Sequence, residues 1–307
     1  MSKRPALISA LLTLAFVAWL WHAGMAEAWL TQLARVPVGL WLLMVLGMLA
    51  SYGLRAWRIA REFADVAGMR WILALRIVLA HTALVNVLPM RSGELGFPWL
   101  MRRALNVPWL DASASLLWLR LQDASVLGVL AIWMWPGLDL GWRLGTMVAL
   151  LAGLVLGMRW LQGLSRKPRT GRLSRLTPLT QALARRGQKM GQGWLITTAN
   201  WLLKLSLQAW LLAELLNRDW ATGWAGAMGA ELSALLPIQG LGGVGSYEAG
   251  SAVALRWHGI DWTSGLQAAL SMHLVVLACS LSFGLLAWWL PRPLIARHNA
   301  ESESETR

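Results

Sequence analysis

The segment 235–250, LLPIQGLGGVGSYEAG, interrupts a long apolar region with one proline and five glycines. Pro237 prevents the preceding helix from continuing, and glycine permits the tight bends that follow. A second helix can begin with Ser246 as its N-cap and Glu248 in its first turn, where a carboxylate interacts favourably with the helix dipole. The segment therefore predicts a helix, a glycine-rich break and a second helix. The glycines of the break are Gly240, Gly242, Gly243, Gly245 and Gly250.

The two helices beside this break, about 220–236 and 246–257, are mostly apolar. Each is shorter than the ~20 residues that a helix needs to cross a bilayer. Inside a bilayer, the backbone groups of such a break must be buried in protein or face a water-filled cavity. A glycine-rich loop outside the membrane is the alternative interpretation. The apolar flanks favour a re-entrant hairpin, whose break is a candidate binding site.

The composition excludes a soluble domain. Hydrophobic residues make up 57% of the 307 residues and charged residues 14%, as in a polytopic membrane protein. The net charge of +13 comes from basic residues in short segments between apolar runs, which favours the positive-inside pattern over nucleic-acid binding. The single cysteine, Cys279, excludes an intrachain disulfide and a multi-cysteine metal site. The five histidines lack metal-ligand spacing, so we expect neither a metal nor another cofactor.

The apolar runs predict an all-α membrane fold with six full spans and two hairpins that enter from opposite sides. The expected spans are about 6–21, 38–56, 110–135, 142–161, 193–216 and 266–290. The first resembles a signal peptide, but its length and tryptophans favour an uncleaved anchor. Residues 1–297 form the expected membrane domain, and 298–307 an acidic, disordered tail.

Basic residues predict the orientation of the spans in an inner or plasma membrane. The loop 165–191 contains eight basic residues and no acidic one, so it should be cytoplasmic together with both termini. The arginines near the end of the second span also indicate the cytoplasmic side. They are Arg55, Arg58, Arg61 and Arg70.

A second interrupted element follows the apolar stretch 71–88, which carries His81. The string 86–96, NVLPMRSGELG, places a proline, an arginine and a glutamate where lipid contact would be costly. We expect this element to enter from the cytoplasm and to return the chain to Arg102 and Arg103. Its residues of interest are Asn86, Pro89, Arg91, Gly93 and Glu94.

The two interrupted elements share an order of apolar pair, proline, glycine and glutamate. Interrupted hydrophobic segments in the two halves of a transporter often form its substrate site. The similarity is short, so chance is the alternative to an inverted repeat.

Several ionisable residues lie inside or beside apolar runs, where they normally pair or line a polar path. One interpretation is that Arg120 pairs with Asp123, and Arg91 with Glu94, only to hold helices together. The other is that Arg91 acts with Arg120 or Lys204 to bind a lipid phosphate, because guanidinium recognises phosphate oxygens through two hydrogen bonds.

The strings 86–94 and 236–248, with the R-x-x-D pair at Arg120 and Asp123, resemble the flippase-like family that includes the membrane region of lysylphosphatidylglycerol synthases. The resemblance covers about 3–297 and implies lipid transport. The chain departs from the family pattern at Leu119, Ile238 and Gln239, which affects substrate specificity. No aminoacyl-transfer domain follows Arg297, so the resemblance does not imply lipid lysylation.

These observations favour a lipid transporter that moves an anionic headgroup, with no nucleic-acid partner. The alternatives are a membrane-embedded transferase or hydrolase acting on a lipid phosphate, and an accessory subunit of envelope-lipid synthesis. No catalytic motif favours an enzyme. A homo-oligomer, or a partner from envelope-lipid synthesis, is compatible with each of these three functions. The expected substrate-binding residues are Asn86, Pro89, Arg91, Gly93, Glu94, Arg120, Asp123, Lys204, Pro237, Gly240, Gly242, Gly243, Gly245, Ser246 and Glu248.

Overall fold

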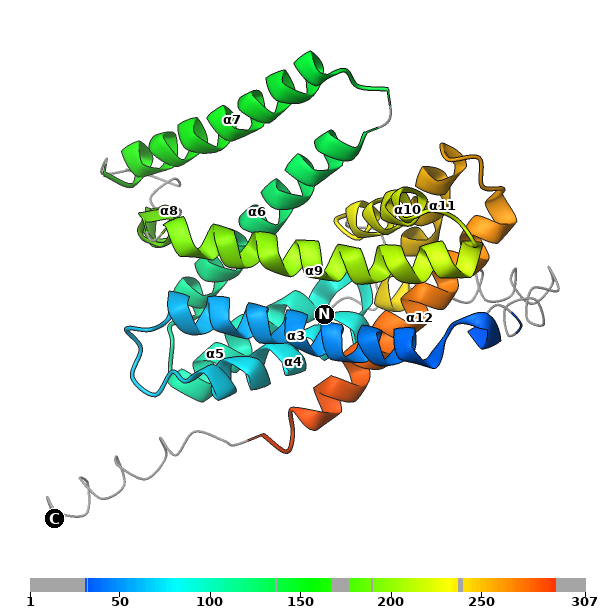
Figure 1. The fold of residues 1–307 in the computed structure, drawn as a ribbon. Coiled ribbons are helices and arrows are strands. Elements are labelled where there is room, and N and C mark those ends of the chain that lie inside the picture. Colours follow the sequence, from blue (N-terminus) through cyan, green and yellow to red (C-terminus); the bar gives the residue numbers. More distant parts are fainter. Residues whose placement is uncertain are drawn as a thin grey trace, which may run out of the picture.

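The computed structural model describes residues 31, 33–135, 137–166, 177–188, 190–236 and 240–290. These residues form helices without a strand (Figure 1), which confirms the all-α class. The α-helices are α3 (Val38–Glu62), α4 (Trp71–Val87), α5 (Gly96–Leu105), α6 (Trp109–Met134), α7 (Leu140–Arg166), α8 (Thr177–Gln188), α9 (Met190–Leu216), α10 (Trp220–Ser233), α11 (Ser246–Arg256) and α12 (Trp262–Leu286). Two short 3-10 helices are η1 (Pro89–Leu95) and η3 (Leu241–Gly243).

Four described helices are long and apolar enough to cross a membrane: α3, α6, α7 over Leu140–Gly163, and α12. They match four of the expected spans within a few residues. Helix α9 has 27 residues but is not among the four, and it carries the polar Asn200, Lys204 and Gln208. The expected first span and the expected acidic tail lie outside the described residues. The count of six spans therefore stays a prediction.

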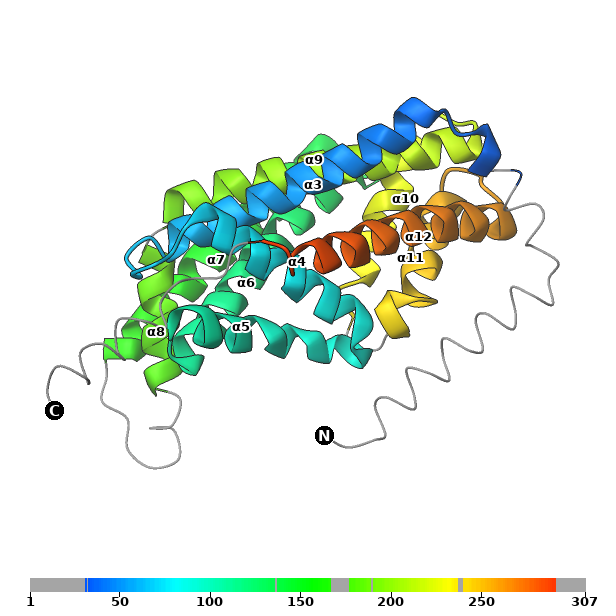
Figure 2. The same ribbon diagram turned by 90° about the horizontal axis from the view of Figure 1, so that it is seen from below.

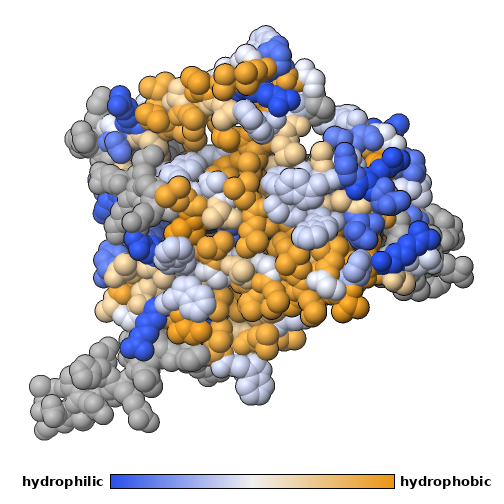
Figure 3. Space-filling view, in the orientation of Figure 1, coloured by the Kyte–Doolittle hydropathy of each residue, from blue (hydrophilic) through white to orange (hydrophobic). Residues whose placement is uncertain are grey.

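The molecular surface agrees with a membrane location. Hydrophobic residues cover the middle of the face shown in Figure 3, and hydrophilic residues gather toward the two ends of the helices. Many tryptophans are exposed, among them Trp142, Trp160 and Trp289. Little of α7 is buried against the rest of the molecule, as in a span that faces lipid.

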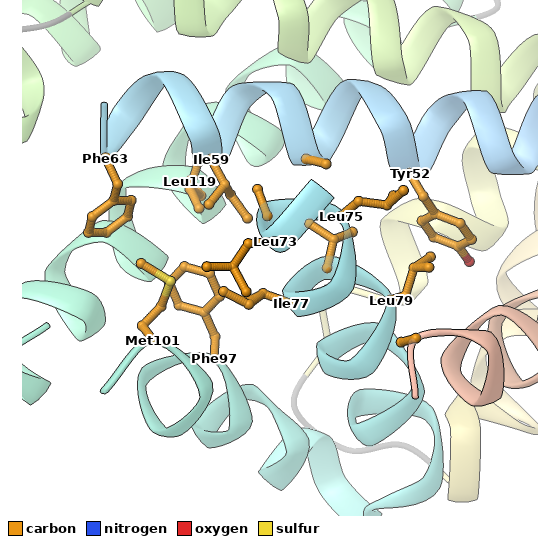
Figure 4. Packing of buried hydrophobic residues seen from close by; sticks show 14 of the residues in the cluster. Tyr52, Ile59, Phe63, Leu73, Leu75, Ile77, Leu79, Phe97, Met101 and Leu119 are labelled. Atoms are coloured by element: carbon orange, nitrogen blue, oxygen red, sulfur yellow. The ribbon is translucent and has the colours of Figure 1, made fainter. Parts of the chain in front are cut away.

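Helices α3 and α9 run side by side in both ribbon views (Figures 1 and 2). One apolar cluster joins α3, α4, α5 and α12, and Figure 4 shows Phe63, Phe97 and Met101 lying together within it. A second cluster joins α3, α6, α9, α10 and α12 around fully buried leucines such as Leu205 and Leu211. These two clusters fix the helices that surround the site.

Each interrupted element is a helix, a break and a helix, as the sequence predicts. The first consists of α4, η1 and α5, and the second of α10, η3 and α11. The Ser115 hydroxyl donates to Glu62, which places the start of α6 beside the end of α3, at the end of the bundle where α4 begins. At the other end, the Trp135 and Trp257 rings are 5.0 Å apart, so α6 and α11 finish together. The two elements therefore start from opposite ends of the bundle.

Helix α8 was not expected, because the segment 165–191 reads as a charged loop. It packs against α6 and α7, and its Arg185 lies 3.2 Å from Asp111 at the start of α6. Ala182 and Ala184 are buried in this contact region. The buried face of α8 consists of small apolar residues among many basic ones, so it has no strong apolar pattern in the sequence.

Candidate functional site

The two interrupted elements meet inside the bundle. Gly242 lies against the end of α4, where an added Cβ atom would be 3.2 Å from the Asn86 carbonyl oxygen. Gly93 lies even closer to α4, because a Cβ atom there would be 2.2 Å from the Leu84 carbonyl oxygen. Only glycine allows the first motif to fold back so tightly.

Backbone angles assign different roles to the five glycines of the second motif. Gly242, Gly243 and Gly245 have φ angles of 64°, 91° and 90°, in the region that favours glycine. Gly240 has a φ of −66°, which other residues adopt equally well, and Gly250 lies within α11. The expectation that all five glycines serve to bend the backbone was therefore wrong for Gly240 and Gly250.

A cavity of about 180 Å³ lies where the two elements meet. The Gly242 and Gly243 backbone forms part of its wall, and polar side chains from seven helices line much of the rest. These side chains are Ser51, Tyr52, Arg55, His81, Thr82, Asn86, Arg120, Asp123, Asn200, Lys204, Glu231, Tyr247 and His273. The predicted site residues that line this cavity are Asn86, Arg120, Asp123, Lys204, Gly242 and Gly243.

Arg120 and Asp123 belong to one charge network with Glu94, and their pairing differs from the expected one. Arg120 Nη2 lies 2.7 and 2.8 Å from the two Glu94 carboxylate oxygens and thus connects α6 to η1. Asp123 is 3.4 Å from Arg120 but only 2.8 Å from Arg58. The expected Arg120–Asp123 pair is therefore the weaker contact, because Arg58 on α3 reaches the carboxylate more closely. Trp201 Nε1 donates to the same carboxylate at 3.2 Å.

Lys204 is also paired. Its Nζ atom lies 2.8 Å from Glu231 Oε1. The Tyr247 hydroxyl and the Gln208 side-chain amide donate to that same oxygen, at 2.9 and 2.8 Å. This network holds α9, α10 and α11 together and neutralises the lysine.

Glu248 fixes the start of α11. Its Oε2 atom accepts a hydrogen bond of 2.7 Å from the Gly245 backbone N–H, and Gly245 is the N-cap in place of the expected Ser246. The Ser246 hydroxyl donates to the Gly243 carbonyl at 3.0 Å. Glu248 Oε1 lies 2.6 Å from His273 Nδ1, and both side chains are buried. The glutamate of the first motif likewise has a histidine neighbour, since Glu94 lies 3.5 Å from His81.

Arg55 differs from the other cations of the cavity. Its Nη1 atom donates to the Thr82 hydroxyl at 3.2 Å, and its guanidinium lies 5.8 Å from the centre of the Tyr52 ring. Within the described part of the chain, no carboxylate lies within 4 Å of it, whereas Arg58, Arg120 and Lys204 each have one. Arg55 is thus a cavity cation without an acidic partner among the described residues.

Arg55 and Arg58 were not expected in the site, because their position after an apolar run is typical of cytoplasmic topology markers. In the structure Arg58 is 6% exposed and Arg55 lines the cavity, so both belong to the polar interior, whichever side of the membrane they mark. A sequence signal existed. Ser51, Arg55 and Arg58 are spaced by four and three residues, which puts them on one face of a mostly apolar helix.

Three predicted site residues cannot be placed against this cavity. Pro237 lies outside the described residues, as do the side chains of Pro89 and Arg91. The expected Arg91–Glu94 pair stays a prediction.

The comparison with protein families agrees with this architecture. The model of the lysylphosphatidylglycerol synthase TM region matches residues 6–284, nearly the whole chain. The chain belongs to this family. No curated protein and no solved structure matched. Membership in the lysylphosphatidylglycerol synthase TM region family, together with the apolar helices, identifies a multi-pass membrane protein related to lipid metabolism or transport.

Proposed function

We propose that this protein is a lipid transporter that moves an anionic, phosphate-bearing headgroup across the bilayer through the central cavity. The observation that carries the proposal is the placement of Arg55, a cavity cation whose described polar partner is a hydroxyl group. Removing a charge from water is expensive, and a charge at this depth normally pairs or serves a polar pathway. A phosphate group entering the cavity would supply the missing negative charge.

The chemistry of Arg55 suits a phosphate monoester or diester. A guanidinium group presents a planar set of donors that can bind two phosphate oxygens at once. Thr82 already orients one of its nitrogens, and the Tyr52 ring supports its face. Acyl chains of the same lipid would remain in the bilayer while the headgroup crosses, which lowers the cost of moving the charge.

The paired cations have a different role in this proposal. Arg120 and Lys204 are neutralised by Glu94 and Glu231, so each must share its donors with a carboxylate. The backbone amides at the start of α11 are also less available to an anion, because the Gly245 N–H donates to Glu248. The headgroup would therefore bind first at Arg55. Arg91 remains a second anion-binding residue on the strength of its motif alone.

Substitution of Arg55 tests the proposal in liposomes that contain phosphatidylglycerol with a reporter on the headgroup. We expect Arg55→Gln to reduce headgroup movement at least about tenfold, because a charge-assisted hydrogen bond contributes ~1.5–3 kcal/mol. Arg55→Lys should retain part of the activity, since it keeps the charge and loses the planar donor set. Arg61→Gln, at an exposed position on the same helix, is the matched control.

The same assay separates the alternative functions. Well-folded Arg55→Gln protein with wild-type headgroup movement would contradict the proposed site. A change in lipid mass after incubation with wild-type protein would favour a transferase or hydrolase. Inactivity of the pure wild-type protein, restored by an added lipid synthase, would favour an accessory subunit.

A further inference from the structure

His273 lies between two hydrogen-bond acceptors that belong to the second interrupted element. Its Nδ1 atom is 2.6 Å from Glu248 Oε1, and its Nε2 atom is 3.1 Å from the Gly242 carbonyl oxygen. The imidazole ring stacks on Tyr247, with ring centres 4.2 Å apart. One histidine of α12 thus contacts the glycine-rich break and the first turn of α11 together.

Both contacts of His273 can be hydrogen bonds only if the Glu248 and His273 side chains together hold a specific number of protons. A neutral imidazole has only one N–H, so it cannot donate to a carboxylate and to a carbonyl at the same time. Both hydrogen bonds form if the ring is an imidazolium facing a carboxylate, or if a protonated Glu248 donates to Nδ1 while Nε2–H donates to Gly242. Both arrangements contain the same number of protons and have no net charge, which suits a site where both side chains are buried.

We propose that Glu248 and His273 form a buried proton-binding site whose proton fastens the glycine-rich break to α12. Loss of this proton leaves one N–H for two acceptors. If that N–H stays with Glu248, the Nε2 lone pair faces the Gly242 carbonyl oxygen, and the break loses its attachment. The pair also becomes a buried negative charge, which favours opening toward water.

The groups around the pair allow this proton to be exchanged. His273 itself lines the cavity, so the proton can pass to water there. The charged network of Glu231 and Lys204 adjoins the pair through Tyr247, whose hydroxyl donates to Glu231 and whose ring stacks on His273. The other titratable or charged groups that line the cavity or lie on α12 are Tyr52, Arg55, His81, Arg120, Asp123 and Cys279.

Movement of this break would change the cavity, because Gly242 and Gly243 form part of its wall. Positive φ angles at three glycines provide backbone positions that can change conformation without a side-chain clash. If the proposed transport function is correct, protonation of the pair would then couple pH to the change between access states. The proton site itself does not depend on the identity of the substrate.

A spin label on the break measures this attachment without a transport assay. The label is placed at Val244 in a Cys279→Ala background, and its mobility is recorded by EPR spectroscopy between pH 5 and 9 in lipid nanodiscs. We expect an immobilised label at low pH and at least about a tenfold rise in the ratio of mobile to immobile label at high pH. Glu248→Gln should keep the label immobile throughout, because the amide can donate to Nδ1 and accept from Gly245 without titrating. His258→Gln, at an exposed histidine, should behave as wild type.

NMR spectra of ¹⁵N-histidine in the unlabelled protein provide a second measurement. The His273 resonances, assigned by their loss in His273→Gln, should titrate in the wild type and not in Glu248→Gln. Mobility that is independent of pH, or a pH dependence that persists in Glu248→Gln, would overturn the proposal. Absence of headgroup transport alongside the expected mobility change would reject the transport function and leave the proton site intact.

Discussion

Arg58 of α3 and Asp123 of α6 form a buried salt bridge, with 2.8 Å between Nη1 and Oδ1. The two residues are 65 positions apart, and their side chains are 7% and 9% exposed. Removing one member of such a pair leaves an uncompensated charge away from water. The bridge therefore holds α3 against α6 inside the bundle, and the packing of these helices depends on it.

We expect Asp123→Asn to lower the free energy of unfolding by about 3–5 kcal/mol, because Arg58 then loses its carboxylate. A second substitution, Arg58→Gln, should restore more of that loss than Arg120→Gln, since Arg120 is 3.4 Å from Asp123 and keeps Glu94. Thermal unfolding in detergent, followed by tryptophan fluorescence, compares the two double variants. Equal restoration by both would contradict the assigned pairing.

Loss of the charge at Arg55 and loss of the charge at Arg58 should have different effects on the unfolding temperature. Arg55→Gln removes a cation whose described polar partner is a hydroxyl, so the unfolding temperature should stay constant or rise. Arg58→Gln leaves Asp123 with a weaker partner and should lower the unfolding temperature by several degrees. A marked loss of stability in Arg55→Gln would indicate a structural role for Arg55.

The contrast between these arginines shows where sequence reasoning reached its limit. Long apolar runs and the two proline–glycine strings determine helix ends almost directly, because the bilayer permits few alternatives. Partner choice within the polar network depends instead on how α3 is rotated against α6. The spacing of Arg120 and Asp123 predicts a local pair, whereas the better partner of each residue lies on another element, Glu94 for one and Arg58 for the other.

Helices α10 and α11 approach each other through two glycines. A Cβ atom on Gly250 would lie 2.5 Å from the Gly229 carbonyl oxygen. Gly250→Ala should therefore push the helices apart and cost about 1–3 kcal/mol, despite alanine's higher helix propensity. Gly157→Ala on α7 is the matched control, because no atom lies within 4 Å of the added Cβ position. Unfolding curves that rank the two variants in the opposite order would exclude this close contact.

Asp261 caps α12 outside the membrane-spanning segments and should make stability depend on acid pH. Hydrogen bonds from Ser264 hold the pKa of this carboxyl below its ordinary value, and the Ser264 backbone N–H lies 3.0 Å from Oδ1. A lowered folded-state pKa means that the stabilisation is complete above the unfolded pKa of ~4 and is lost as the pH falls through the folded value.

Asp261→Ala should then cost about 1 kcal/mol at pH 7 and progressively less below pH ~4, because the wild-type cap is itself lost there. Asp261→Ser keeps a cap that does not titrate, so the pH dependence should disappear while most stability remains. Unfolding temperatures measured between pH 3 and 7 compare the three proteins. An Asp261→Ala deficit that grows at low pH would contradict the assigned direction of the pKa shift.

The glycine-rich break also illustrates what sequence reasoning could and could not predict. Its position and its flanking helices follow from Pro237 and the apolar pattern, although the N-cap of α11 is Gly245, one residue before the expected Ser246. The roles of single glycines did not follow, because a glycine needed for a positive φ and one needed for helix contact look identical in a sequence. The two acceptors of His273 have no signal in the sequence, and only the three-dimensional structure reveals them.

The orientation of the bundle in the membrane is the last prediction. The contact of Trp135 with Trp257 places the α6–α7 and α11–α12 connections at one end, and the Asp111–Arg185 contact places α8 at the other. Basic residues around α8 predict that its end, and both termini, face the cytoplasm. Single cysteines in a Cys279→Ala background test this with a membrane-impermeant reagent in intact cells.

Cysteines at Arg218 and His258, both exposed, should react from outside, as should one at Gly137. Arg218 is preferred to its neighbour Asp219, which caps α10 through the Thr222 backbone N–H at 2.9 Å. A cysteine at Ser174 should react only after the membrane is permeabilised. Reaction at Arg218 and Ser174 from the same side would contradict two elements that enter from opposite faces. Reaction at Ser174 alone in intact cells would keep that arrangement and invert the whole bundle, which would contradict the positive-inside assignment.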